Sequence, residues 1–155
     1  MKDGHLAAAV GKRSAEDVLK LPVRHLGLTL ARPVDVLLDR DDFRVVGLDV
    51  LCGDEEHRFL PLAAATIRDD AIEISSPLVL LEETELAFYR SRTVSLEALR
   101  GRPVRRRDAK VGALRDLLLE DDLSVAAVVV EQDGRRLTLP FDGAITIDPR
   151  NRSAA

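Results

Sequence analysis

A strand-turn-strand pattern that occurs twice constrains the fold more than any other feature of the sequence. Residues 34–62 contain an apolar run, an acidic turn, a second apolar run, a charged turn and a Leu-Pro pair. Residues 114–141 follow the same order, with an Asp-Gly turn before the Leu-Pro pair. Short apolar runs between polar turns are typical of β-hairpins, and the long helical patterns of a parallel α/β sheet are missing. The sequence therefore predicts an all-β fold with minor helix.

The two stretches align at an offset that starts at 81 residues and falls to 79. The matched positions are Pro22-Val23-Arg24 with Pro103-Val104-Arg105, Asp35 with Asp116, Leu37-Leu38 with Leu118-Leu119, Asp42 with Asp122, Val45 with Val125, Val50 with Val130, Leu60-Pro61 with Leu139-Pro140 and Ala65 with Ala144. The offset shrinks at Arg40 and near Glu55-Glu56, in charged turns where length changes are tolerated. Ordered matches of this kind indicate an internal duplication.

Apolar runs and turn residues locate the expected elements. The expected strands lie at 34–38, 45–51, 58–62 and 71–74, and again at 111–114 with 117–119, 125–130, 137–139 and 144–147. Asp133-Gly134 is the strongest hairpin signal, because this dipeptide suits the positive φ angles of a type I′ turn. Ser14 is suited to cap a short helix, which Pro22 ends. Helical spacing after Glu82 and a second cap at Ser95 predict one or two short helices in 82–100.

These elements predict two small tandem β-barrels, with the apolar run 78–81 closing the first. The expected organisation is an N-terminal extension with a short helix (1–21), a first barrel unit (22–81), a helical connector (82–100), a second barrel unit (101–149) and a tail (150–155). Short strands with frequent turns are typical of such barrels. The second unit ends without a counterpart of 72–74, so its barrel needs another segment or another chain to complete it.

The order of residues in the second unit is similar to that of a known family. Gly101-Arg102-Pro103-Val104, Val111-Gly112, residues 114–119, residues 125–130 and Leu139-Pro140-Phe141 resemble the PRC-barrel family. That family includes the cytoplasmic domain of the photosynthetic reaction centre H subunit and the C-terminal domain of the ribosome maturation factor RimM. The resemblance covers about 103–147 well and 22–75 more weakly, where Leu30-Ala31 replaces the Val-Gly pair. It implies a tandem pair of small barrels that act in docking or assembly, as most members of that family do.

Composition limits the classes of function. The net charge is -4 and the pI is about 5.4, so overall attraction to nucleic-acid phosphates is not expected. Aromatic residues make up 3% of the chain, which leaves few platforms for stacking bases. Cys52 is the single cysteine, which excludes an intrachain disulfide and fits a reducing compartment. No apolar run is long enough to span a membrane, and the run 6–10 is too short for a signal peptide, so we expect a cytoplasmic protein.

The densest basic run is the candidate site for a partner. Its members are Arg102, Arg105, Arg106, Arg107, Lys110 and Arg115. If Pro103-Val104 begins a strand, alternation places Arg105 and Arg107 on one face. Such a face can bind an acidic protein or phosphate groups. It can equally be a solvated edge strand, which its charge protects from pairing with other chains.

The sequence contains no motif for catalysis, for a metal or for a cofactor. His5, His25 and His57 lie far apart in the chain, and together with Cys52 they do not supply the converging ligands of a zinc site. The acidic turns at 39–42 and 120–122 lack the spacing and the glycine of a calcium loop. Gly-rich phosphate loops and the Gly-x-Ser-x-Gly nucleophile motif are missing as well. We therefore predict no catalytic residue, no metal and no cofactor.

The predicted function is a non-catalytic protein-interaction or assembly module, an adaptor of PRC-barrel type with an unidentified protein partner. Small barrels leave exposed edges and cannot bury all of their apolar surface, so binding through a β edge or the basic face is expected. A ribosome maturation or RNA-associated factor is one alternative. A structural homo-oligomer, with strands exchanged between chains, is another.

Overall fold

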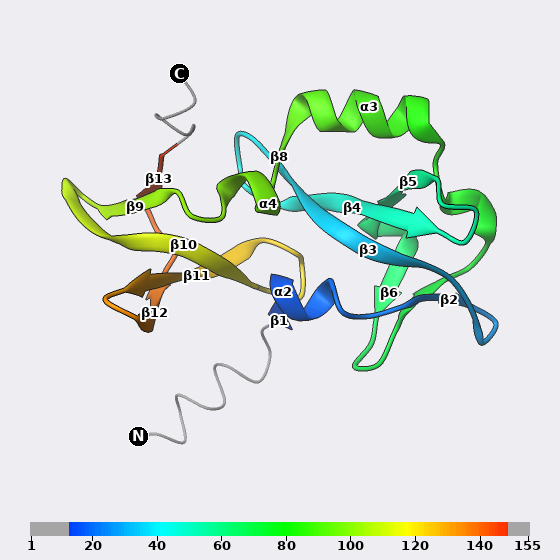
Figure 1. Ribbon diagram of the computed structural model, residues 1–155, viewed down its shortest axis with the longest axis horizontal. Helices are drawn as coiled ribbons and strands as arrows, with labels where there is room; N and C mark the ends of the chain where they lie inside the picture. Colours follow the sequence, from blue (N-terminus) through cyan, green and yellow to red (C-terminus); the bar gives the residue numbers. More distant parts are fainter. Residues whose placement is uncertain (1–12, 149–155) are drawn as a thin grey trace. The chain divides into compact units, whose positions relative to one another are not determined.

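Two β-sheets dominate the structure. The computed structural model describes residues 13–148, of which most lie in strands (Figure 1). Strands account for 54% and helices for 18%, and one of the sheets curls into a half-barrel, which confirms the predicted mostly-β fold with minor helix. The chain divides into two compact units. From here on, residues 16–96 are the first unit, and residues 97–148 with 13–15 are the second. The predicted tail (150–155) lies outside the described residues.

The first unit is built on long antiparallel strands. Its elements are α2 (Ala15–Val18), β2 (Val23–His25), β3 (Leu28–Asp39), β4 (Val45–Cys52), β5 (His57–Pro61), η1 (Leu62–Ala64), β6 (Ala65–Ile67), β7 (Ile72–Ile74), η2 (Pro77–Val79), α3 (Glu83–Arg92) and β8 (Thr93–Ser95). The strand order is β5-β4-β3-β2-β7-β6, with β8 paired to β3. Strands β2 and β7 pair in parallel, at Val23 with Ile72, whereas the neighbouring pairs are antiparallel.

The second unit has the same order of central strands. Its elements are β1 (Arg13–Ser14), α4 (Leu96–Leu99), β9 (Pro103–Arg106), β10 (Ala109–Leu119), β11 (Val125–Gln132), β12 (Arg135–Pro140) and β13 (Ile145–Ile147). The strand order is β12-β11-β10-β9-β13, with β1 paired to β10. Strand β13 lies beside β9, as β7 lies beside β2, but it runs antiparallel to its neighbour. In the second unit β13 therefore occupies the position that β7 has in the first unit, but it runs antiparallel to its neighbour instead of parallel.

The central strands β3 and β10 are irregular at matching positions. The register shifts lie between residues 33 and 35 and between 37 and 38 in β3, and between 114 and 116 and between 118 and 119 in β10. Each shift in β10 thus comes 81 residues after one in β3. Asp35 and Asp116 follow the first shift, and each carboxylate accepts the N–H of the next residue at 2.8 Å. Register shifts of this kind are typical of β-bulges, and the two central strands have them at matching positions.

Helix α3 packs on the sheet of the first unit. Its Leu86 is fully buried against Leu37 and Phe59, and the Tyr89 ring stacks on the Phe59 ring with the centroids 4.1 Å apart. Before the helix, Leu81 pairs with Phe59 through two backbone hydrogen bonds of 2.8 and 2.9 Å. Of the run 78–81 that was predicted to close the first barrel, only Leu81 forms a bridge to a strand edge.

The core of the second unit is aliphatic. The largest fully buried side chains are Leu114, Leu117 and Leu119, and Val104, Val128, Val130 and Ile145 are buried as well. Strand β12 is exposed along almost its whole length, and Leu137 retains 40% of its accessible surface. No described strand pairs with the outer side of β12. Strand β12 is therefore an exposed sheet edge, whereas β5 in the first unit is bridged by Leu81.

Candidate functional site

The predicted basic residues gather partly on one hairpin of the second unit. Strands β9 and β10 form this hairpin, and the cross-strand pairs are Arg106 with Ala109 and Arg105 with Lys110. Arg107 lies in the turn with a positive φ of 58°, so strand alternation ends at Arg106 and does not place Arg105 and Arg107 together. Arg106, Arg107 and Lys110 are exposed. We call Arg105, Arg106, Arg107 and Lys110 the basic hairpin.

The other two predicted residues serve contacts within the second unit. Arg102 Nη1 donates to the carbonyl of Asp148 at 3.3 Å. Arg115 Nε donates to Glu131 Oε1 at 2.6 Å across the β10–β11 pair. Arg105 of the basic hairpin also lies 3.7 Å from an Asp148 oxygen. The exposed charge of the predicted run is therefore concentrated in Arg106, Arg107 and Lys110.

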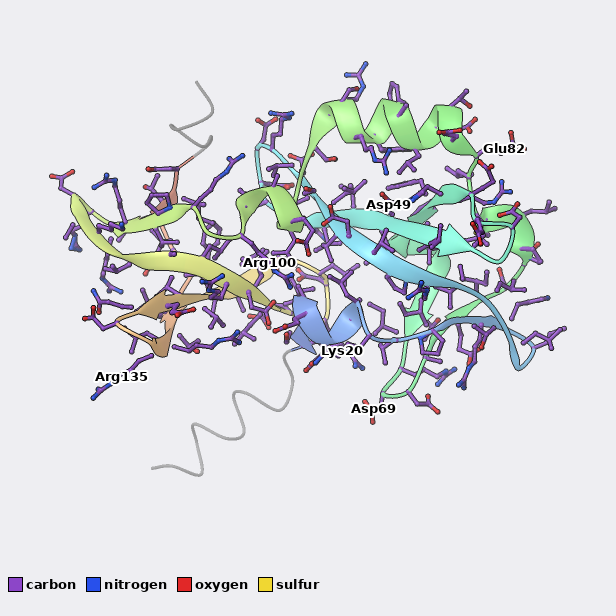
Figure 2. All side chains as sticks on the ribbon, viewed as in Figure 1. Lys20, Asp49, Asp69, Glu82, Arg100 and Arg135 are labelled. Atoms are coloured by element: carbon purple, nitrogen blue, oxygen red, sulfur yellow. The ribbon has the colours of Figure 1, made fainter. Side chains whose placement is uncertain are left out.

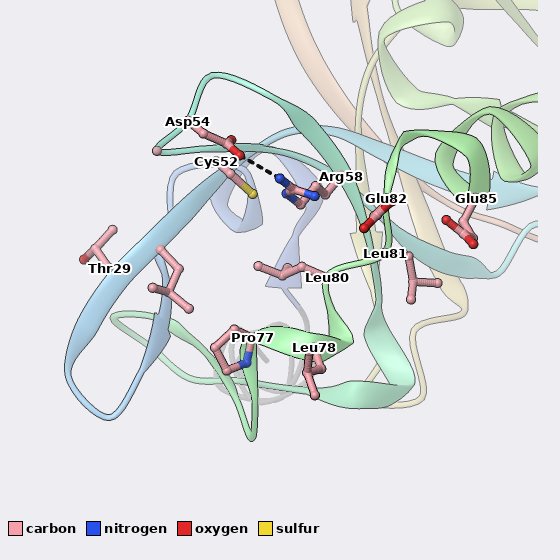
Figure 3. Close-up of a pocket in the computed structure, with 12 residues that line it drawn as sticks. Thr29, Cys52, Asp54, Arg58, Pro77, Leu78, Leu80, Leu81, Glu82 and Glu85 are labelled. Carbon is pink, nitrogen blue, oxygen red and sulfur yellow. Dashed lines mark hydrogen bonds and ion pairs between the residues drawn. The ribbon is translucent and has the colours of Figure 1, made fainter.

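A groove in the first unit was not predicted from the sequence. It is open to solvent, has a volume of about 870 Å³, and lies between β3, the β4–β5 turn and the segment 77–85 (Figure 3). The lining residues are Thr29, Leu30, Cys52, Gly53, Asp54, Arg58, Pro77, Leu78, Leu80, Leu81, Glu82 and Glu85. Apolar side chains come from β3 and from the segment 77–85, and the charged side chains are mainly acidic. The groove therefore combines apolar side chains with charged ones that are mainly acidic, and we call Asp54, Glu82 and Glu85 its acidic rim.

Large exposed leucines lie in the groove or at the tip of the β2–β3 hairpin beside it. Leu78, on η2, has 88% of its surface exposed. Leu26 and Leu28, at the tip of the β2–β3 hairpin, have 84% and 68% exposed. Leu28 directly precedes the lining residues Thr29 and Leu30 on β3. The sequence signal was leucine on both sides of Gly27, at a tight turn where polar residues are usual.

Polar groups at the β4–β5 turn form one side of the groove. Arg58 Nη2 lies 2.6 Å from Asp54 Oδ2, and the Glu56 N–H donates to Asp54 Oδ1 at 3.0 Å. The Glu56 N–H and then the Arg58 guanidinium lower the pKa of Asp54, so this carboxylate is ionised at neutral pH. Burial raises the pKa of the Cys52 thiol, and Arg58 offsets this only in part. A protonated thiol is a weak nucleophile, so Cys52 acts here as part of the groove wall.

A buried carboxylate ties helix α3 to the sheet beneath it. Asp49 lies on β4 with almost no exposed surface (Figure 2). One of its oxygens lies 2.8 Å from His57 Nδ1, and the other accepts from Arg90 on α3. A charged residue inside the apolar run 45–51 was the sequence signal for this contact. Asp49 does not line the groove, so it positions the helix and takes no part in binding there.

The two units differ in charge. The first unit carries nine Lys and Arg against sixteen Asp and Glu, a net charge of −7. The described part of the second unit carries ten of each and is neutral. The acidity of the whole chain therefore resides in the first unit, which contains the groove.

Comparisons with known proteins do not assign the chain to a family. No protein-family model matches it, and no curated protein matches it significantly. Among the described residues, no three His, Cys, Asp or Glu side chains are grouped as ligands for a metal ion. Residues 13–148 also contain no helix of the length and apolarity that crossing a membrane requires.

Proposed function

We propose that this chain is a non-catalytic protein-interaction module of PRC-barrel type, and that the groove of the first unit is its main binding surface. One observation carries the proposal: leucines at the groove and on the adjoining hairpin are exposed, at 88% for Leu78 and 68% for Leu28. Exposed apolar side chains beside a hollow are typical of interaction sites, because a partner removes them from water. Single exposed leucines elsewhere on a protein need no such explanation.

Features shared by the two units support a tandem pair derived by duplication. The bulges of β3 and β10 lie at a constant offset, as do Asp35 and Asp116, which accept the same local hydrogen bond. Leu26 and Arg107 also lie 81 residues apart, and both have positive φ angles at the tip of a hairpin. Local irregularities of this kind are features that related folds keep. They are consistent with the PRC-barrel resemblance, which is strongest in the second unit.

The test is a selection from a random-peptide display library. The wild-type chain is compared with the variant Leu28→Ser/Leu78→Ser, and peptides that bind only the wild type are expected. Both side chains are exposed, so we expect the variant to keep its stability within about 0.5 kcal/mol. Leu137→Ser in β12 is the matched control, because Leu137 is also exposed but lies in the second unit. Selected peptides that bind the double variant as well as the wild type would contradict the proposal.

The basic hairpin supports a second surface of the same module, for an acidic protein. Its exposed arginines can form bidentate hydrogen bonds with carboxylates. Replacing Arg106 and Arg107 with Ser is expected to weaken binding of a polyglutamate probe, measured by fluorescence anisotropy. An RNA-associated role predicts a different result, a steep loss of binding to a single-stranded RNA probe as salt increases. The two probes, titrated under the same conditions, decide between these partners.

A further inference from the structure

The groove includes a stretch of sheet edge with which no described strand pairs. Strand β4 pairs with β3 from Ala31 onward, opposite Cys52, and does not reach Thr29. On the other side, His25 and Leu28 close a two-residue hairpin whose turn residues, Leu26 and Gly27, have φ angles of 52° and 81°. In such a hairpin the N–H and C=O groups of the closing pair form hydrogen bonds with each other across the two strands. The N–H and C=O of the next residue point away from the partner strand. Thr29 therefore directs its N–H and C=O toward the groove.

The first unit already shows how an extended segment adds to its sheet. At the outer edge of β5, Leu81 donates to Phe59 O and accepts from Phe59 N, at 2.8 and 2.9 Å. The contact is a bridge of one residue pair, made by a segment without further strand structure. A peptide lying beside Thr29 can form the same pair of hydrogen bonds. Addition of a strand to an exposed edge is a common mode of peptide binding, in which the backbone gives affinity and side-chain pockets give specificity.

The charge of the rim identifies the side chains that such a peptide carries. Of the lining residues, Asp54, Glu82 and Glu85 are acidic, and Arg58 is the single basic one. Arg58 already forms an ion pair with Asp54 at 2.6 Å, which leaves Glu82 and Glu85 as the surplus charge. Both glutamates are exposed: Glu82 directly precedes α3, and Glu85 lies in its first turn (Figure 3). Complementary charge selects a partner and speeds its association, so Lys and Arg are favoured next to this rim.

We propose that the groove binds an extended peptide that adds as a short strand beside Thr29, places apolar side chains on Leu30, Leu78 and Leu80, and directs Lys or Arg to Glu82 and Glu85. This inference rests on the protein-interaction function proposed above, and it specifies the class of partner. The occupant is a basic, apolar segment of another protein. Its backbone is recognised at the sheet edge, and its charge is recognised at the rim.

The backbone contact is tested with a proline. Thr29→Pro removes the N–H that points to the groove, while the β2–β3 pairing does not use that N–H. Proline is tolerated in an edge strand when its missing N–H faces outward. Thr29→Val keeps the N–H and is the matched control. For peptides from the display selection, Thr29→Pro is expected to raise the Kd about tenfold or more, and Thr29→Val by less than about twofold.

The charge is tested by reversal at the rim. Glu82→Lys/Glu85→Lys is expected to raise the Kd of the same peptides about tenfold at low salt, and the effect shrinks as salt increases. Asp69→Lys/Asp70→Lys is the matched control, because it changes the net charge equally at an exposed turn of the same unit. Figure 2 shows Asp69 at the β6–β7 turn, apart from Glu82 before α3. The control pair is expected to leave the Kd within about twofold.

The outcomes separate the two proposals. A selection that yields no groove-dependent peptide contradicts the proposed function. Groove-dependent peptides without enrichment in Lys and Arg, or with affinity insensitive to Thr29→Pro, overturn the peptide class while the interaction function stands. Light scattering tests whether a second copy of this chain occupies the groove. A self-association that Glu82→Lys/Glu85→Lys abolishes would show that a second copy fills the groove, and would also overturn the inference.

Discussion

The two units place different side chains at one equivalent position of their sheets. At an offset of 79, Phe59 of β5 corresponds to Thr138 of β12. Phe59 is buried under helix α3 and stacks on Tyr89, whereas Thr138 is exposed. The neighbouring strand differs as well. A Cβ on Gly47 of β4 would lie 2.3 Å from the Phe59 ring, and the counterpart of Gly47 at an offset of 80 is Ala127 of β11.

This difference shows how one sheet acquires a helical cover. The aromatic ring of Phe59 needs room on β4, which Gly47 provides, and it then presents a flat surface to Tyr89 and Leu86. In the second unit the equivalent pair is Ala127 and Thr138, and Thr138 is exposed. The start of α3 also supplies Glu82 and Glu85 to the acidic rim of the groove. The helical cover and the proposed binding site of the first unit therefore share one segment.

The strongest test of this comparison replaces the ring. Phe59→Ala is expected to lower the free energy of unfolding by about 3–5 kcal/mol, because it leaves a cavity under α3. Thr138→Ala, at the equivalent exposed position, is expected to change it by less than about 0.5 kcal/mol. Urea denaturation followed by circular dichroism measures both. Similar effects at the two positions would show that the two faces are packed alike, contrary to the comparison.

A smaller effect is expected from the polar contact between α3 and the sheet. Asp49→Asn keeps the size of the side chain but removes the charge shared by His57 and Arg90. Both partners are partly exposed, so the loss is moderate, about 2 kcal/mol. The counterpart at an offset of 80 is Val129, and Val129→Thr, which introduces a hydroxyl at this half-buried position of β11, is the control. Hydrogen exchange of the α3 amides is the measurement, and unchanged protection in Asp49→Asn would argue against this anchor.

The close approach of Gly47 to Phe59 gives a third prediction. Gly47→Ala is expected to cost about 1–3 kcal/mol, because its Cβ meets the ring and the carbonyl of Leu60, which lies 2.6 Å away. In the Phe59→Ala background the ring is gone, so the cost is expected to fall clearly. A double-mutant cycle measures the coupling. Additive effects of the two substitutions would mean that the ring is not what requires glycine at this position.

The sequence predicted the hairpins β3–β4 and β11–β12 because strand and turn signals are local, whereas the short strands β2, β6 and β8 were not predicted. The acidic turn 39–42 and the Asp133-Gly134 hairpin connect strands in the structure, and the alternating runs 72–74 and 145–147 are strands. The partners of these strands were not predictable by the same means. Residues 72–74 pair in parallel with β2, and 145–147 pair antiparallel with β9, because pairing depends on the path of the chain.

The candidate sites were predicted less well, for a physical reason. A run of arginines is visible in one segment, and four of its six members do share a hairpin. The groove combines Thr29, Cys52 and Leu78, which come from three distant segments and carry no motif. Its one local signal, leucine at a tight turn beside Gly27, indicates exposure but not what lies beside it. Surfaces formed by tertiary packing leave only such indirect traces in a sequence.

The smallest expected effect concerns acid stability at the β3–β4 turn. The Asp39 carboxylate accepts the N–H groups of Asp41 and Asp42 at 2.7 and 3.2 Å, and these hydrogen bonds lower its pKa below the ordinary value of 3.8. A group whose pKa is lower when folded stabilises the fold above the unfolded pKa, and this contribution is lost as pH falls through the folded pKa. Asp39→Asn is therefore expected to reduce slightly the loss of stability below about pH 4. A carboxyl NMR titration of Asp39 against pH gives the direct measurement. A midpoint at or above the ordinary value would show that the hydrogen bonds of this turn do not contribute to the acid sensitivity of the first unit.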